Sequence, residues 1–139
     1  MMHDKYIAQR LPEAGATLMI LPRPEFSRSL VLSALVQHNA AHYAVKARLS
    51  PTNPEIIRCA QVMGWLNLMP ARLLRLRRII EMRMLTCPIT QRPLYSWRKI
   101  GRTFRVDHHT AQRWHSAGVA LLAAAIRADL EMQDRGMAA

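Results

Sequence analysis

The chain has 139 residues, the size of one ordinary domain, and half of them are apolar, so a hydrophobic core is expected and disorder throughout is excluded. Twenty Lys and Arg against nine Asp and Glu give a net charge of +11, and 17 of the 20 cations are Arg. A balance this basic indicates a polyanionic partner, either a nucleic acid or an anionic membrane surface.

Several other classes are excluded by composition. Two cysteines, Cys59 and Cys87, cannot form a disulfide framework and fit a reducing, cytoplasmic setting. No long apolar segment follows the N-terminus, so a secretory signal is not expected. The longest apolar run, about residues 118–126, is far shorter than the ~20 residues that a transmembrane helix needs. No membrane partner is therefore predicted.

Good helix formers dominate the chain, prolines separate the apolar stretches, and no alternating pattern is long enough for a strand. Helices are expected over about residues 4–20, 27–48, 53–68 and 70–85. Pro12 and Gly15 are expected to bend or split the first helix. Ser27 is the predicted N-cap of the second and Asn53 of the third. The fold class predicted is all-α, a compact helical domain with a helix-turn-helix near its C-terminal end.

The fourth predicted helix has the clearest periodicity. Its apolar residues Leu73, Leu76, Ile80 and Met84 recur at spacings of three and four. Arginines occupy much of its remaining surface, and Glu81 can pair with one of them, either Arg77 or Arg78. About half of this arginine row is expected to be a solvated face, and the rest is available to a DNA backbone or an acidic partner.

The positive charge is concentrated in one block of the sequence. Residues 1–55 carry a net charge of +2 and residues 116–139 a net charge of −1. Residues 56–115 carry twelve cations but only two acids, Glu81 and Asp107, for a net charge of +10. Clustered charge of this kind is typical of a nucleic-acid-binding surface, whereas charge that only aids solubility is dispersed.

The segment 96–114, SWRKIGRTFRVDHHTAQRW, predicts two short helices joined by a tight turn. Ser96 is the expected cap of the first and Asp107 of the second. Gly101 lacks a side chain where the second helix would cross closely, and Val106 fills the turn. The inward-facing positions of the second helix are expected to be Ala111, Trp114 and either Val119 or Leu121. This is the layout of a helix-turn-helix, whose second helix lies in the DNA major groove.

Two sets of residues are the candidate DNA contacts. Those on the outer side of the second helix can read base edges, since Arg suits guanine and Gln suits adenine: His108, His109, Thr110, Gln112 and Arg113. Those around the turn can contact phosphates: Arg92, Arg98, Lys99, Arg102 and Arg105.

The segment from Leu68 to about Leu122 resembles region four of bacterial sigma factors and related small regulators. Their "LPxRxRxII" and "S-W/Y-xx-I-xxx-F/L-x-V" patterns appear here as MPAR at 69–72, RIIEMR at 78–83 and the motif from Ser96. The resemblance implies a DNA-binding helix-turn-helix. The sequence departs from the pattern at Arg105, often Gly in that family, which must adopt an awkward backbone or a different turn. The loop 86–95 is also long and contains prolines. A complete sigma factor is not expected in 139 residues.

Most of the chain also resembles a family of small phage- and prophage-associated proteins of Proteobacteria. The family's opening appears as RLPEAGATLMILP at residues 10–22, and its "GWL" element as GWLNLM at residues 64–69. This resemblance implies a phage or prophage origin but no activity.

The sequence thus predicts three regions. Residues 1–50 are N-terminal helices, of which 4–48 are available to dimerise or to contact a partner such as RNA polymerase. Residues 51–126 are the basic DNA-binding region, with the helix-turn-helix at about 96–122. Residues 127–139 are a polar tail. The predicted function is a sequence-specific double-stranded DNA-binding regulator of transcription, a homodimer or higher homo-oligomer.

Two other functions stay open: a small terminase subunit that recognises viral DNA for packaging, and an inhibitor that binds an acidic protein surface. No catalytic motif is present, so an enzyme is not predicted. His38 and His42 lie four residues apart, and His108, His109 and His115 could be grouped with Cys87. No carboxylate or cysteine lies near His38 and His42 in the sequence, so surface or interface histidines are favoured there. His108 and His109 are expected to point in different directions on a helix, so no metal or cofactor is predicted.

Overall fold

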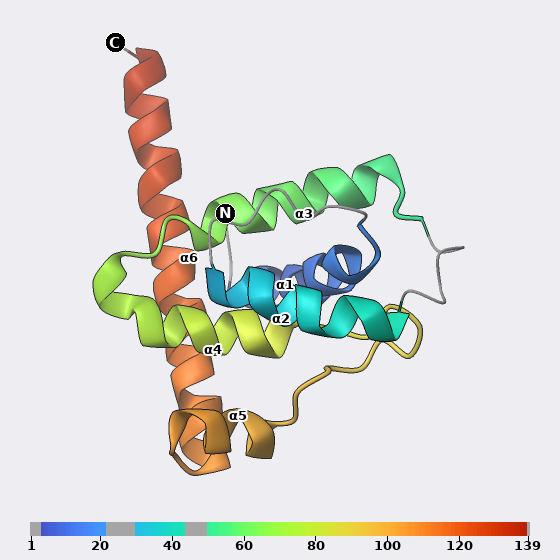
Figure 1. Ribbon diagram of the computed structural model, residues 1–139. Coiled ribbons are helices and arrows are strands. Elements are labelled where there is room, and N and C mark those ends of the chain that lie inside the picture. Colours follow the sequence, from blue (N-terminus) through green and yellow to red (C-terminus); the bar gives the residue numbers. More distant parts are fainter. Residues whose placement is uncertain (1–3, 22–29, 44–49, 139) are drawn as a thin grey trace.

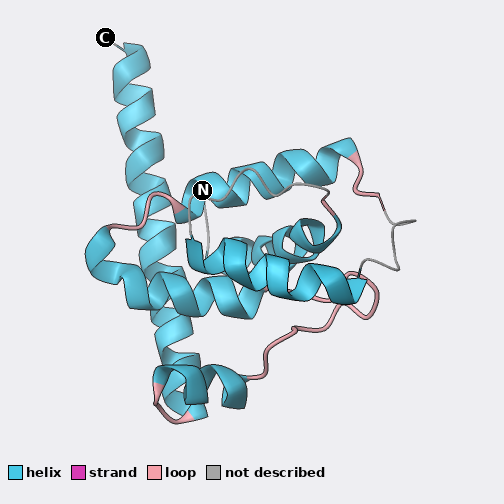
Figure 2. Ribbon diagram, viewed as in Figure 1, coloured by secondary structure: helices cyan, strands magenta, loops and turns pink. Residues whose placement is uncertain are grey.

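The computed structural model describes residues 4–21, 30–43 and 50–138. The helices in this part of the chain are, in order, α1 (Asp4–Ile20), α2 (Leu30–Tyr43), α3 (Asn53–Leu66), the short 3-10 helix η2 (Ala71–Leu73), α4 (Leu74–Met84), α5 (Trp97–Phe104) and α6 (His108–Ala138). The described residues form no strand, and their one β-bridge joins Thr86 to Pro93 (Figure 2). The all-α prediction is confirmed.

The first helix forms over the predicted residues, but it is not split. α1 continues through Pro12, which is exposed, and through Gly15, which is buried. A Cβ on Gly15 would lie 1.9 Å from the carbonyl oxygen of Met84, so this glycine allows α1 to approach the end of α4 closely. Both predicted ends of the second helix, Ser27 and Arg48, lie outside the described residues.

The start of α3 differs from the prediction by one residue. Thr52, not Asn53, is the N-cap: its hydroxyl accepts a hydrogen bond from the Glu55 backbone N–H at 3.3 Å, and the Glu55 carboxylate accepts one from the Thr52 N–H at 2.9 Å. This reciprocal capping box satisfies two N–H groups, which a cap at Asn53 would not do. The fourth predicted helix starts later than expected, since residues 71–73 form η2 before α4 begins.

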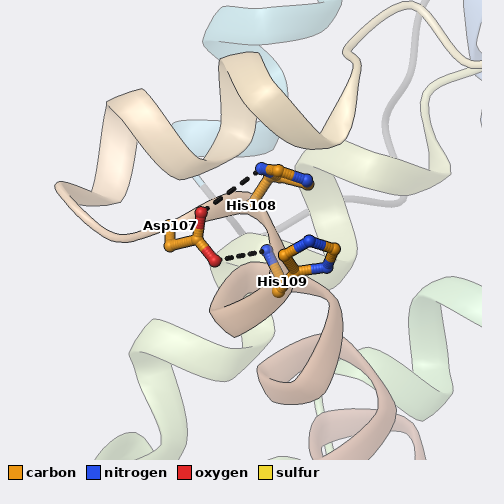
Figure 3. A group of neighbouring side chains, drawn as sticks. All are labelled: Asp107, His108 and His109. Atoms are coloured by element: carbon orange, nitrogen blue, oxygen red, sulfur yellow. Dashed lines mark hydrogen bonds and ion pairs between the residues drawn. The ribbon is translucent and has the colours of Figure 1, made fainter.

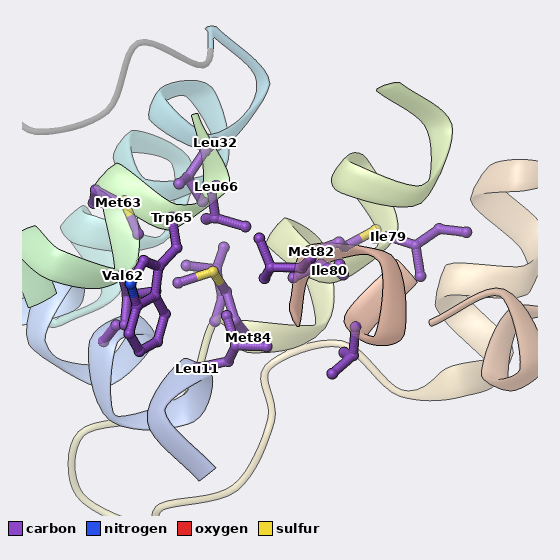
Figure 4. Packing of buried hydrophobic residues seen from close by; sticks show 14 of the residues in the cluster. Leu11, Leu32, Val62, Met63, Trp65, Leu66, Ile79, Ile80, Met82 and Met84 are labelled. Atoms are coloured by element: carbon purple, nitrogen blue, oxygen red, sulfur yellow. The ribbon is translucent and has the colours of Figure 1, made fainter. Parts of the chain in front are cut away.

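The core lies where α1, α3, α4 and α6 meet, and Figure 4 shows part of it. Leu11 of α1 and Val62, Trp65 and Leu66 of α3 are buried there, and Met84 of α4 lies between these helices. Ile80 and Met84 are buried as their spacing predicts, whereas Leu73 and Leu76 are only half-buried. The three tryptophans pack in or against this core and are not exposed stacking platforms.

The last helix is much longer than expected. The segment 127–139, predicted as a polar tail, continues α6 as far as Ala138. Its last buried residue is Ile126, and beyond it the helix projects away from the other helices (Figure 1). In the part of the chain that the structure describes, no helix is long and apolar enough to cross a membrane.

Candidate nucleic-acid interface

The first helix of the predicted motif is α5, and its ends are fixed locally. The hydroxyl of Ser96 accepts a hydrogen bond from the backbone N–H of Lys99 at 3.1 Å, which caps the helix as predicted. Ile100 is completely buried, and Trp97 and Phe104 are half-buried against the core. The apolar face therefore holds α5 against the body and leaves its basic face in solvent.

The turn between α5 and α6 is tight and strained. Arg105 ends α5 with φ 58° and ψ 43°, in the left-handed region that favours glycine. Of the two alternatives that the sequence left open at this position, the structure adopts the awkward backbone. A Cβ on Gly101 would lie 2.7 Å from the carbonyl oxygen of Val106, so the turn closes directly over this glycine. The close approach predicted at Gly101 is confirmed.

The start of α6 is capped by Asp107. One of its carboxylate oxygens accepts a hydrogen bond from the His109 backbone N–H at 3.2 Å, and the other lies 3.3 Å from Nδ1 of His108 (Figure 3). The His108 and His109 rings lie side by side, with centroids 4.0 Å apart. The expectation that these rings diverge is therefore wrong, because at the first turn the cap draws His108 back toward Asp107.

Asp107, His108 and His109 are also the one group of three potential metal ligands among the described residues. The two rings are tilted by only 37°, so they are closer to stacking than to converging on one point. One ligand atom from each of the three residues nevertheless lies within 4.8 Å of the others. Of the other predicted histidine pair, His38 is exposed, and the side chain of His42 lies outside the described residues.

Of the five predicted base-reading residues, His108 is drawn back to Asp107, and the other four divide into two groups. His109, Gln112 and Arg113 share the outer face of α6 with Ser116, at spacings of three, four and seven, and these four residues line a shallow hollow of about 430 Å³. Thr110 lies at the margin, where its hydroxyl accepts a hydrogen bond from Arg113 at 3.1 Å. Ser116 was not among the predicted residues, although its helical spacing from His109 could have identified it.

The predicted phosphate-contacting residues are all exposed: Arg92, Arg98, Lys99, Arg102 and Arg105. Four of them lie on α5 or its turn, and Arg92 lies in the loop 86–95. Arg105 also lines a hollow of about 590 Å³ together with Arg75 and Arg78 of α4. The structure thus adds two cations to the set, because the packing of α4 against α5 places them beside the turn.

The other two α4 arginines act within the fold, and Arg75 also lies over the Trp114 ring, 5.5 Å from its centroid. Arg77 donates from Nε to the buried carboxylate of Glu81 at 2.7 Å, so of the two predicted partners the structure selects Arg77. Arg83 lies over the Trp97 ring at 4.2 Å from its centroid and donates to the Tyr95 carbonyl oxygen at 3.0 Å. Burial lowers the pKa of Arg83. Arg83 is therefore an anchor for α5.

His115 completes this anchor from the side of α6. Its ring meets the Trp97 ring edge-on, with centroids 5.1 Å apart. Burial and the nearby Arg83 charge lower the pKa of His115 from its usual 6.5 to about 4. A neutral His115 and a charged Arg83 thus hold Trp97 between α4 and α6, which fixes the orientation of α5 against the first turns of α6.

No family model, curated protein or solved structure matches this chain. Its function therefore has to be argued from the α5–turn–α6 unit (residues 97–116) and the charge around it. Between Glu81 and Asp129 the sequence contains one acid, Asp107, and that carboxylate caps α6. The exposed surface of the unit is consequently basic, with hydrogen-bonding side chains on one face of a capped helix.

Proposed function

We propose that this chain binds double-stranded DNA sequence-specifically, with the first turns of α6 in the major groove. The observation that carries the proposal is the outer face of α6, where His109, Gln112 and Arg113 lie together and exposed or half-exposed. Arg113 can donate two hydrogen bonds to a guanine edge, and Gln112 can pair with an adenine edge. Arg98, Lys99 and Arg102 of α5 then supply phosphate contacts that fix the helix in the groove.

The proposed biological role is transcription regulation in a bacterial cell or a phage-infected host. The likeness of residues 68–122 to sigma region four supports this role, and the likeness of most of the chain to phage-associated proteins supports its origin. The strained backbone of Arg105 supports the proposal as well: a glycine would relieve the strain, and a phosphate contact by the arginine side chain would offset it. We assign the protein a binding function and no catalytic one.

Selection from random duplexes followed by sequencing would identify the site, and fluorescence anisotropy with that duplex would measure affinity. Arg113→Ala and Gln112→Ala should each weaken binding by about 1–3 kcal/mol and relax the preference at one base pair. Arg135→Ala, an exposed arginine in the last turns of the same helix, is the matched control and should leave binding unchanged. If binding to the selected and to scrambled duplexes is equal, or if Arg113→Ala matches Arg135→Ala, the proposal fails.

A further inference from the structure

One part of α6 is apolar on all sides. Residues 116–126, SAGVALLAAAI, contain no charged side chain over three turns. One face of this segment is buried against the body through Val119, Leu122, Ala123 and Ile126. A helix that is apolar all round is normally covered all round. Among the residues that the structure describes, only one side of this segment is covered.

The opposite face forms an exposed apolar stripe, which we call the α6 stripe. Its members recur at spacings of four, three, four and four: Ala117, Leu121, Ala124, Ala128 and Met132. Leu121 is 41% exposed and Met132 is 71% exposed. At 1.5 Å per residue the stripe is about 22 Å long, and its second half lies on the projecting end of the helix (Figure 1). A surface of this length and shape is suited to packing against one partner helix, because it offers few polar groups to water.

We propose that the α6 stripe packs against the α6 stripe of a second copy of the chain, with the two helices antiparallel. In the antiparallel register centred between Ala124 and Ala125, Met132 lies opposite Ala117 of the other copy, and Leu121 lies opposite Ala128. Each large side chain thus meets a small one, which allows close packing. A parallel pair would instead place each large residue beside its own copy and leave gaps between the alanines. A two-fold axis makes this interface self-complementary.

The charges at the two ends of α6 favour the same orientation. Asp129, Glu131 and Asp134 give the last turns a net charge of −1 against two arginines. The region around the first turns is basic, and because its arginines are the proposed DNA contacts, their charge orients the second copy at a distance and forms no ion pair with it. Antiparallel pairing brings the acidic end of one helix to the basic end of the other, and it also opposes their dipoles favourably. The projecting last turns, with no other helix beside them in Figure 1, are free to extend along the partner.

The first test is the mass of the full chain in solution, by sedimentation equilibrium from 1 to 100 µM (roughly the range in which modest interfaces dissociate). A dimer is expected. Leu121→Glu should weaken dimerisation by about 100-fold or more, since it would bury an unpaired carboxylate. Leu130→Glu is the matched control, because Leu130 is 43% exposed on the other face of the same helix, and it should leave the dimer intact. Circular dichroism checks that both variants fold.

The second test determines the orientation by cysteine cross-linking under mild oxidation, in a Cys87→Ser background. Cys59 is buried, and burial raises its pKa to about 12, so it should not react. Ala124→Cys alone should link two chains, because this position lies at the two-fold axis. Ala117→Cys alone should not, whereas a mixture of Ala117→Cys and Met132→Cys chains should.

Four results would overturn the inference. These are a monomer at 100 µM (roughly the upper limit for a modest interface), equal effects of Leu121→Glu and Leu130→Glu, efficient linkage of Ala117→Cys to itself, and a ring of eight or more subunits. Binding of the monomer to phosphatidylcholine–phosphatidylglycerol vesicles through Leu121 would assign the stripe to a lipid surface and would overturn it as well. None of these measurements involves DNA, so the inference and the proposed function can fail independently.

Discussion

The backbone N–H of Val106 donates a hydrogen bond to the carbonyl oxygen of Gly101 at 2.9 Å, and the carbonyl oxygen of Val106 lies 2.7 Å from the position that a Cβ on Gly101 would take. This relationship sets the angle between α5 and α6. The contact between Gly101 of α5 and Val106 of the turn thus determines how the basic face of α5 is placed relative to the outer face of α6.

Gly101→Ala should therefore destabilise the protein by about 2 kcal/mol, because the new methyl group would press on backbone that has no room to move. Gly64→Ala is the matched control. Gly64 is also inside a helix, but nothing lies within 4 Å of its hypothetical Cβ, so alanine should stabilise by up to about 1 kcal/mol through helix propensity. Urea denaturation of both variants measures the difference. Equal changes in the free energy of unfolding for the two variants would contradict the close approach of the Val106 backbone to Gly101.

Arg105→Gly should have opposite effects on stability and on DNA binding. Relief of the left-handed backbone should raise the free energy of unfolding by about 0.5–1 kcal/mol. Loss of the cation should reduce the slope of log affinity against log salt by about 0.9, if Arg105 contacts one phosphate. Arg105→Lys keeps both strain and charge and should change neither quantity much. A stabilised variant with unchanged salt dependence would remove Arg105 from the phosphate-contacting set.

Arg77→Met should destabilise the fold by about 1–2 kcal/mol, because the Glu81 carboxylate is 1% exposed and would lose the charge-assisted hydrogen bond from Arg77. Arg78→Met, one residue further along, should stay within about 0.5 kcal/mol, since Arg78 is exposed. The two variants should have the opposite order of effect on DNA binding: at low salt, Arg78→Met should weaken affinity more than Arg77→Met does. Thermal unfolding and anisotropy together check this assignment of the two arginines.

The stability of the protein should fall as pH falls between 6.5 and 4 through His115. Its pKa is lowered to about 4 in the folded chain from the usual 6.5, so the unfolded chain binds the proton first and protonation favours unfolding. The loss reaches about 3 kcal/mol at most. His115→Phe keeps an aromatic ring beside Trp97 but cannot be protonated, so its stability should depend less on pH in this window. If the free energy of unfolding depended on pH equally in the two proteins, the burial of a neutral imidazole at His115 would be contradicted.

Features controlled by neighbouring residues could be read from the sequence. The all-α class, the bounds of α1, the caps at Ser96 and Asp107 and the glycine contact at position 101 follow from propensity, capping and spacing within a few residues. The N-cap of α3 was missed by one residue because Thr52 and Asn53 are both good caps, and the choice depends on the distance to Glu55.

The sequence by itself determined that this protein is helical, that its positive charge is concentrated in residues 56–115, and that a tight turn separates two helices, but not that the second helix continues to Ala138. Only the tertiary structure decided what each cation does. Arg83 lies over the Trp97 ring while Arg75 and Arg78 line a hollow with Arg105, and helical periodicity cannot separate these roles. The partners come from other helices, so the separation requires α4 to be packed against α5 and α6. For the same reason, only the structure showed that one face of the apolar run in α6 is left uncovered.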